Sequence, residues 1–135
     1  MKKIFGIFLL MGGILTVSFA QKIASAKVPV AVKSAFTKKH PGIKVNWETE
    51  SQNFEAGFTL NGKETSEVYS PAGALLETEV SIKTNELPVS ALTRLKGMKI
   101  AEAAKITKAD GAVLFEAEVK GKDLLFDANG NPSKL

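Results

Sequence analysis

Apolar and polar residues alternate along the first half of the chain, a pattern that predicts the strands of a half-buried sheet. The alternation runs through residues 43–50, 54–60, 63–69 and 76–82. Short turn sequences rich in Ser, Asn, Pro and Gly separate these stretches. We therefore expect four consecutive antiparallel strands that are apolar on one face.

The turn at Asn61-Gly62 sets the register of the middle hairpin. Both residues tolerate positive φ, which a tight two-residue turn requires. With that turn, Phe58 faces Thr65 and Phe54 faces Tyr69 on the returning strand. The register therefore places the aromatic side chains of this hairpin on one face.

A helical spacing of apolar residues precedes the strands. Val32, Ala35 and Phe36 recur at i, i+3 and i+4 after Val28-Pro29, and Pro is favourable in the first turn of a helix. His40-Pro41-Gly42 ends this spacing. We expect a helix between these two signals.

The same order of signals returns in the second half. Leu87-Pro88 opens another helical spacing, Lys120-Gly121 repeats the hairpin turn, and the turn after Phe126 repeats the one after Tyr69. Each arm of the second hairpin is two residues shorter, which keeps every side chain on its face because strands have period two. Phe115 then faces Phe126.

These patterns predict an α+β fold with two tandem repeats, residues 28–82 and 87–135, in one compact module. Each repeat is expected to be a helix plus a four-stranded antiparallel sheet, with the helices packed on one sheet face. Whether the two repeats share one sheet stays open. The other face carries polar side chains.

The first 20 residues have the composition of a secretory signal peptide. Two lysines open the chain, an apolar run follows over residues 4–17, and Ser18-Phe19-Ala20 offers the small residues that a signal peptidase reads. The run is shorter than the about 20 residues that span a bilayer, so cleavage is favoured over a membrane anchor. Ala24-Ser25-Ala26 is a second possible cleavage point. We expect a flexible lead over residues 21–27 and a mature protein that is periplasmic or secreted.

Removal of the leader changes the charge balance. Lys and Arg fall from 18 to 16 while Asp and Glu stay at 14, so the net charge becomes 16 − 14 = +2. The remaining charges are mixed, without the basic stripe that neutralises phosphates, and we expect no nucleic-acid partner. The chain has no Cys, so neither disulfides nor a cysteine-linked lipid are available to it.

Few residues suggest chemistry. His40 is the only His, and we favour a cation at a helix C-terminus over a general base or metal ligand, since no Cys or second His completes a metal site. The segment 127–131 has its Gly at position four, whereas a calcium loop needs it at position six, so we favour a hairpin turn. We expect no catalytic residues, no metal and no cofactor, and hence no enzyme.

The polar face and two hairpin tips are the candidate binding surface. Five carboxylates are interpreted as a solvated face, with an acidic docking surface as the alternative: Glu48, Glu50, Glu55, Glu64 and Glu67. The candidate binding residues are Lys44, Asn46, Glu48, Glu55, Thr59, Asn61, Gly62, Glu64, Lys120 and Gly121. Trp47 and Tyr69 are candidate anchors if they are exposed, although strand parity favours the core for Trp47.

Several short motifs resemble the PepSY-like proteins of the bacterial envelope, which are similar in fold to the tandem-repeat β-lactamase inhibitor protein. The motifs are Val28-Pro29, Pro41-Gly42, Val45 to Glu48, Phe54 to Phe58, Asn61 to Glu64, Leu76 to Glu79 and Leu125 to Gly130. The resemblance covers residues 28–135, although no Trp of the second half matches Trp47 and its helix lacks the Pro-Gly stop. It implies a module that binds or inhibits other proteins, particularly peptidases.

The sequence therefore predicts an exported, non-enzymatic protein-binding module that inhibits or regulates a protease or another envelope enzyme. We expect a monomer with a protein partner in the cell envelope. Two alternatives stay open. One is a small-ligand carrier with an apolar pocket, and the other is an envelope structural protein that assembles with itself through edge strands.

Overall fold

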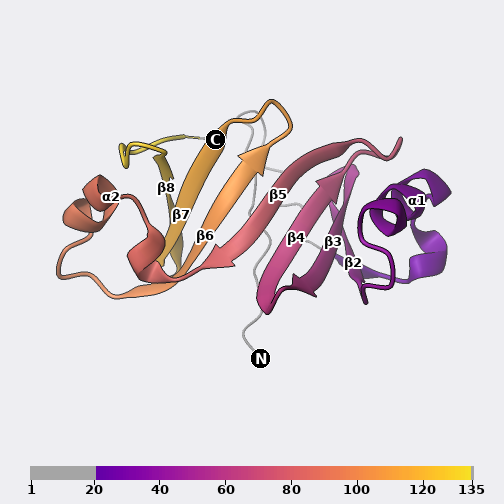
Figure 1. Cartoon of the computed structure of the whole chain (residues 1–135), viewed down its shortest axis with the longest axis horizontal. Helices are drawn as coiled ribbons and strands as arrows, with labels where there is room; N and C mark the ends of the chain where they lie inside the picture. The colour runs from indigo at the N-terminus through magenta and orange to yellow at the C-terminus, as the bar shows by residue number, and fades with distance from the viewer. Residues whose placement is uncertain (1–20, 135) are drawn as a thin grey trace. The chain divides into compact units, whose positions relative to one another are not determined.

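The computed structural model describes residues 21–134, so the expected signal peptide lies outside the described residues (Figure 1). The elements follow in the order β1 (Gln21–Ile23), η1 (Ser25–Lys27), α1 (Val30–Lys39), β2 (Asn46–Glu50), β3 (Asn53–Leu60), β4 (Lys63–Tyr69), β5 (Leu75–Ile82), η2 (Thr84–Glu86), α2 (Val89–Arg94), β6 (Ile100–Lys108), β7 (Val113–Val119) and β8 (Lys122–Asp127), where η marks a short 3-10 helix.

The eight strands form one sheet in the order β1 to β8. The expected fold of two tandem repeats, each a helix plus a four-stranded sheet, is therefore wrong. Only three strands follow α2 in the described chain, and α2 has six residues, so α1 is the only helix of ordinary length there. The order that recurs is a strand, a 3-10 helix, a helix and three strands.

The strand that the sequence pattern missed is β1. It lies within residues 21–27, which were expected to be a flexible lead, and it pairs antiparallel with β2, with Ile23 opposite Trp47. A strand of three residues has too few positions to show an alternation, and its pairing with β2 fixes it instead. Because β1 precedes the first helix, the recurring order begins with a strand rather than with a helix.

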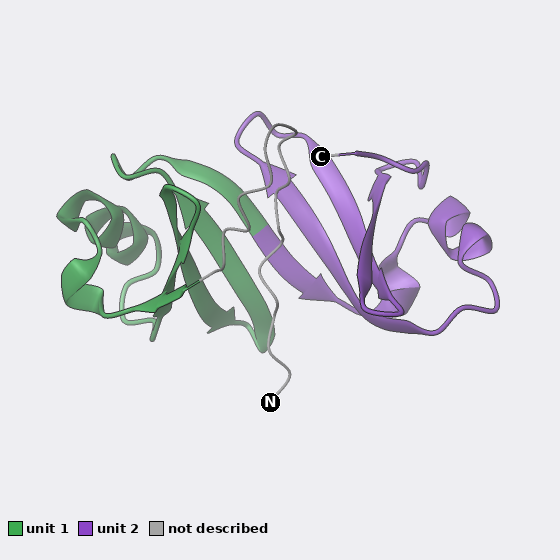
Figure 2. Cartoon of the chain, turned by 180° about the vertical axis from the view of Figure 1, so that it is seen from behind, with its two compact units in different colours: residues 1–6, 12–78 green, residues 7–11, 79–135 purple. Residues whose placement is uncertain are grey.

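Two compact units divide the described chain, unit 1 up to Thr78 and unit 2 from Glu79 onward (Figure 2). The strand β5 supplies side chains to both cores, because Leu75 packs against the core of unit 1 and Ile82 against that of unit 2. The alternation over residues 76–82 predicts Leu76 and Ile82 on the apolar face, and of these two only Ile82 packs against a core.

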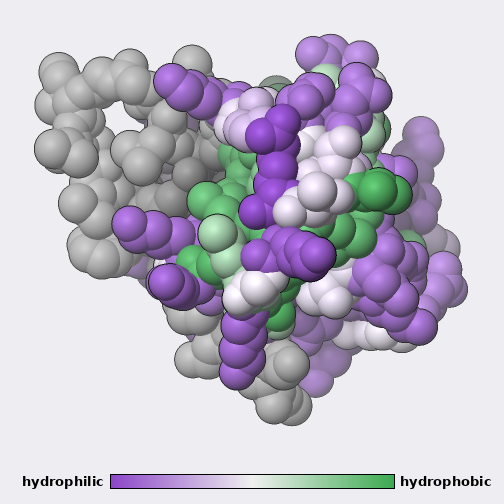
Figure 3. Space-filling view, turned by 90° about the vertical axis from the view of Figure 1, so that its left-hand side faces the viewer, coloured by the Kyte–Doolittle hydropathy of each residue, from purple (hydrophilic) through white to green (hydrophobic). Residues whose placement is uncertain are grey.

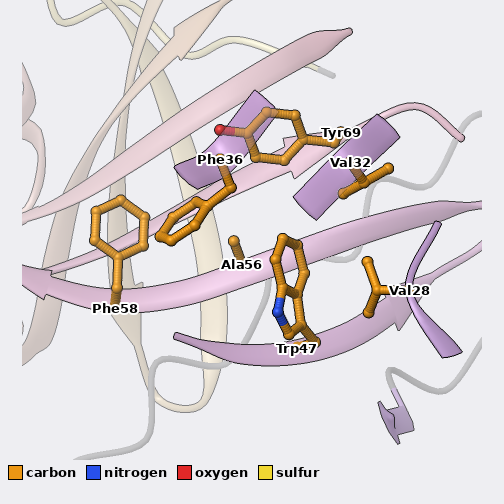
Figure 4. Close-up of a cluster of buried hydrophobic side chains, with 7 residues drawn as sticks. All are labelled: Val28, Val32, Phe36, Trp47, Ala56, Phe58 and Tyr69. Atoms are coloured by element: carbon orange, nitrogen blue, oxygen red, sulfur yellow. The ribbon is translucent and has the colours of Figure 1, made fainter. Parts of the chain in front are cut away.

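The core of unit 1 lies between α1 and the sheet (Figure 4). The ring of Phe36 on α1 packs edge-on against Trp47 and Phe58, with centroid distances of 5.6 and 5.1 Å, the T-shaped arrangement that aromatic pairs favour. The helix has Pro29 as its N-cap and His40 as its C-cap, which confirms the expected start and end signals.

The hairpin registers expected from the sequence are confirmed. Phe58 pairs with Thr65 and Phe54 pairs with Tyr69 across β3 and β4. The intervening turn has the positive φ values that Asn61-Gly62 tolerates, 51° and 75°. In unit 2, β7 and β8 likewise place Phe115 opposite Phe126.

The core of unit 2 is covered by a shorter helix. Ala91 and Leu95, in and just after α2, are buried, but Met98 and Leu124 are 51 and 36% exposed. Figure 3 views the side of the molecule that carries α2, where apolar residues are visible among hydrophilic ones. A helix of under two turns leaves more of its apolar surroundings open than the ten-residue α1 does.

In each unit, one glycine allows a turn to lie close to a helix. Gly73 has φ +87°, and a Cβ added there would lie 2.6 Å from the carbonyl oxygen of Ala31. Gly130 has φ +79°, and its added Cβ would lie 2.6 Å from the backbone nitrogen of Ala91. Glycine is required at both positions for backbone conformation and for space.

Candidate functional site

The polar face of unit 1 is the side of β2, β3 and β4 opposite the core. Strand register builds it in rows, because residues that pair across strands point to the same side. The rows are Asn46–Gly57–Ser66, Glu48–Glu55–Val68 and Thr59–Glu64. The polar face is defined by Asn46, Glu48, Glu55, Thr59, Glu64 and Ser66.

Five of the ten candidate binding residues lie on this face. Asn46 and Thr59 are exposed, Glu48 and Glu64 are partly buried, and Glu55 is buried. Lys44 lies exposed just before β2, and the hairpin tip at Asn61 and Gly62 is exposed between β3 and β4. Lys120 and Gly121 form the corresponding exposed tip of unit 2, between β7 and β8.

Like charges meet on the polar face. Glu48 lies directly opposite Glu55, an arrangement that destabilises a sheet when both carboxylates are ionised. Burial, reinforced by the carboxylates of Glu48 and Glu77, raises the pKa of Glu55 to about 7 against a hydrogen bond with Ser66 that lowers it. The face therefore changes its charge near neutral pH.

Glu67 lies on the other side of β4, inside the core of unit 1. It pairs with Ala56 and is 1% exposed. Tyr69 donates its hydroxyl to Glu67 Oε2 at 2.5 Å, and Lys39 Nζ donates to Oε1 at 2.7 Å. His40 Nε2 lies 3.1 Å from both carboxylate oxygens. Glu67, Tyr69, Lys39 and His40 are called the Glu67 cluster.

Hydrogen bonding decides the charge of the Glu67 cluster. Burial alone would raise the pKa of Glu67, but hydrogen bonds from Lys39, Tyr69 and His40 and the positive charge of Lys39 outweigh it and hold that pKa below its ordinary value. Burial and the Glu67 carboxylate raise the pKa of Tyr69. An ionised carboxylate thus joins the end of α1 to the middle of β4.

The sequence interpretation placed Glu67 wrongly, among the carboxylates of a solvated face. The hairpin register already carried the necessary signal, because Glu67 lies between Thr65 and Tyr69, two residues that face Phe58 and Phe54. Parity alone puts Glu67 on the apolar side. Its partners from α1 adjoin it only through tertiary packing, and the local pattern holds no sign of them.

The candidate anchors are buried. Trp47 is 5% exposed and Tyr69 is 1% exposed, so the condition for an anchoring role is not met. His40 caps α1, as expected for a residue at the helix end, and its ring also packs between Phe36 and Phe58 at centroid distances of 5.1 and 4.7 Å. These residues pack in or against the core of unit 1, on the side of the sheet opposite the polar face.

The segment 127–131 forms a turn that its own first side chain stabilises. Asp127 Oδ1 accepts hydrogen bonds from the backbone N–H groups of Asn129 and Asn131, each at 2.9 Å, and hydrogen bonds from these groups lower the pKa of Asp127.

Among residues 21–134 no group of three His, Cys, Asp or Glu side chains is arranged to hold a metal ion. No helix within that range is long and apolar enough to cross a membrane.

Comparisons with known proteins identify the fold. No family model and no curated protein matches the sequence. A protein of Bacteroides eggerthii described as a candidate periplasmic protein aligns with a TM-score of 0.72 and 16% identity, over 79% of this chain and 86% of its own. A DUF2874 family protein of Bacteroides uniformis aligns with a TM-score of 0.70 and 17% identity, over 78% of this chain and 86% of its own.

A BLIP-like protein of Bacteroides fragilis aligns with a TM-score of 0.62 and 20% identity, over 76% of this chain and 81% of its own. At these identities the comparisons establish the fold alone. A BLIP-like fold agrees with the resemblance to the β-lactamase inhibitor protein, whereas the PepSY-like part of that resemblance stays a prediction. The expected location, periplasmic or secreted, agrees with the description of the B. eggerthii protein. The chain has a BLIP-like fold.

Proposed function

We propose that the chain is an exported, non-enzymatic module that binds a protein of the cell envelope through the polar face of unit 1. The observation that carries the proposal is the strand register, which fixes side chains such as Asn46, Glu48 and Thr59 on a sheet whose other side is a packed core. A preorganised surface loses little conformational freedom on binding, so more of its contact energy contributes to affinity.

The similarity to a BLIP-like protein supports a protein partner, and the composition of residues 1–20 supports export. The charges of the polar face indicate the chemistry of that partner. The partly exposed carboxylates of Glu48 and Glu64 lie on it, with Lys44 at its border. A complementary basic surface would approach these carboxylates favourably. Occlusion of such a surface on an envelope enzyme, a protease among the candidates, would inhibit or regulate that enzyme.

Affinity capture tests the proposal. The mature chain, residues 21–135, serves as bait in an envelope extract, beside a variant with Asn46→Arg and Thr59→Arg. Both positions are exposed on the polar face, so the two arginines obstruct docking without entering the core. We expect one enriched protein with the wild-type bait and loss of that protein with the variant.

Thr37→Arg is the matched control, because Thr37 is exposed on α1 rather than on the polar face. We expect this control to capture the same protein as the wild type. Equal capture by the Asn46/Thr59 variant would refute the assignment of the polar face. Absence of any enriched protein would favour the small-ligand or self-assembly alternative.

A further inference from the structure

We propose that Gln21 becomes pyroglutamate at the N-terminus of the exported chain. The inference rests on the export step of the proposed function. Small residues offer two cleavage points, after Ala20 and after Ala26. We take cleavage after Ala20, because cleavage after Ala26 would remove β1. Cleavage after Ala20 makes Gln21 the first residue of the mature protein, and a glutamine carries a reactive amide at the right distance from its own α-amine.

The chemistry is an intramolecular acyl transfer. The neutral α-amine of Gln21 attacks the side-chain amide carbon, a new C–N bond closes a five-membered lactam, and the former side-chain nitrogen leaves as ammonia. The reaction needs no oxidant, reductant or second substrate. The α-amino group has an ordinary pKa of about 7.7 to 8.0, so a substantial share is neutral and nucleophilic at the pH of the cell envelope.

The Gln21 side chain is accessible for cyclisation, and the cyclised residue can still pair with β2. Its side chain is exposed at the start of β1. Its carbonyl oxygen accepts the Thr49 hydroxyl at 3.3 Å. Ring closure alters neither that carbonyl nor the pairing of Lys22 with Glu48, and the lactam retains one N–H. The modified residue therefore still fits the edge of β2.

The modification would protect a short and important strand. β1 has three residues, and its last, Ile23, lies opposite Trp47 and packs against the core of unit 1. An aminopeptidase that removed two or three residues would abolish this strand and expose the edge of β2. Because a lactam has no free α-amine, such enzymes cannot start at a cyclised Gln21.

Mass spectrometry of the full chain, expressed with its leader and purified from the envelope or the medium, tests the inference. We expect a mature protein lighter by one ammonia molecule than a chain that starts with a free Gln21. Pyroglutamyl aminopeptidase should then expose Lys22 as the new first residue. The Gln21→Ser variant should keep a free amine, because serine has no amide to attack.

The outcomes separate this inference from the proposed function. A chain that starts at Gln21 with a free amine, even after prolonged incubation at neutral pH, refutes pyroglutamate while leaving export intact. A chain that keeps its leader, or that starts elsewhere, refutes the cleavage site. In an aminopeptidase digest we expect the wild type to retain its N-terminus and Gln21→Ser to lose β1. Equal trimming of both proteins would overturn the protective role.

Discussion

Units 1 and 2 repeat one order of elements but fill their cores differently. In unit 1, Ala56 lies between Trp47 and Glu67 on the neighbouring strands. The corresponding alanine of unit 2 lies between Ala103 and Leu124. A bulky indole and a buried carboxylate in one unit therefore take the places of a methyl group and an exposed leucine in the other.

The next pair of corresponding residues in the two units differs by a single hydroxyl group. Tyr69 and Phe126 occupy corresponding positions, opposite Phe54 and Phe115. The Tyr69 hydroxyl is buried and needs an acceptor, which Glu67 supplies. The comparison teaches that one backbone arrangement accepts an ionic or an apolar core. The ionic core makes unit 1 dependent on pH and on hydrogen-bond geometry, as buried ion pairs generally are.

Glu67→Ala should have the largest effect of the substitutions considered. It leaves the buried Tyr69 hydroxyl without its acceptor, removes the partner of Lys39 and opens a cavity. We expect a loss of about 4 kcal/mol in the free energy of unfolding. Trp47 is the only Trp and lies in unit 1, so chemical denaturation followed by its fluorescence measures the loss in that unit.

The double variant Glu67→Leu/Tyr69→Phe sharpens the comparison, because it gives unit 1 the side chains that unit 2 has at Leu124 and Phe126. It removes the Tyr69 donor and the Glu67 acceptor together, which is often nearly neutral, whereas Lys39 and His40 lose their partner as they do in Glu67→Ala. We expect it to be more stable than Glu67→Ala by at least about 2 kcal/mol. Equal loss in both variants would mean that packing volume, rather than hydrogen bonding, explains the effect.

The turn glycines should give the next largest effect. Gly73→Ala and Gly130→Ala each force a Cβ against the backbone of a helix at a positive φ, and we expect a loss of about 3 kcal/mol in either case. Gly62→Ala is the control, because its φ is +75° but its added Cβ has open space. It should cost only about 1 kcal/mol. Thermal unfolding followed by circular dichroism measures all three.

The acid sensitivity of unit 1 should depend on the Glu67 cluster. The pKa of Glu67 is held below its ordinary value of 4.5, so its ionised form stabilises the fold fully above that pH and less as the pH falls through the folded-state pKa. We expect the fluorescence midpoint of the wild type to decline on acidification more than that of Glu67→Leu/Tyr69→Phe. Glu55 is present in both proteins, so its own titration cancels. Parallel declines would contradict the assignment.

The smallest effect should come from the exposed valines that begin the two helices. Val30 and Val89 are 74 and 80% exposed, and surface substitutions usually change stability by within about 0.5 kcal/mol. We expect Val30→Ser and Val89→Ser to unfold at nearly the wild-type temperature in calorimetry. A large loss from either substitution would mean that the valine packs against a surface that its exposure does not reveal.

Local signals in the sequence predicted the hairpins and the first helix. Asn61-Gly62 fixed the register of β3 and β4, and Pro29 with the stop after Lys39 bounded α1. The architecture could not be predicted in the same way, because β1 exists through its pairing with β2. The length of α2, six residues, likewise depends on packing rather than on the Leu87-Pro88 signal that opens it.

The candidate site, like the fold, could be predicted only where local sequence signals determine it. The rows of the polar face follow from strand parity, and parity would also have placed Glu67 in the core. The contacts of Glu67 with Lys39 and His40 join residues that are 28 and 27 positions apart in the chain. Such contacts depend on how α1 lies on the sheet, which no local pattern records.

The dissociation constant of the captured partner, measured by titration calorimetry, tests the central claim most directly. If the polar face of unit 1 is the docking surface and the core is its support, Asn46→Arg/Thr59→Arg should weaken binding at least about tenfold, or 1.4 kcal/mol. Glu67→Leu/Tyr69→Phe and Thr37→Arg should bind like the wild type. Unchanged affinity in the Asn46/Thr59 variant, together with loss of affinity in Thr37→Arg, would contradict the account and place the interface on the α1 side.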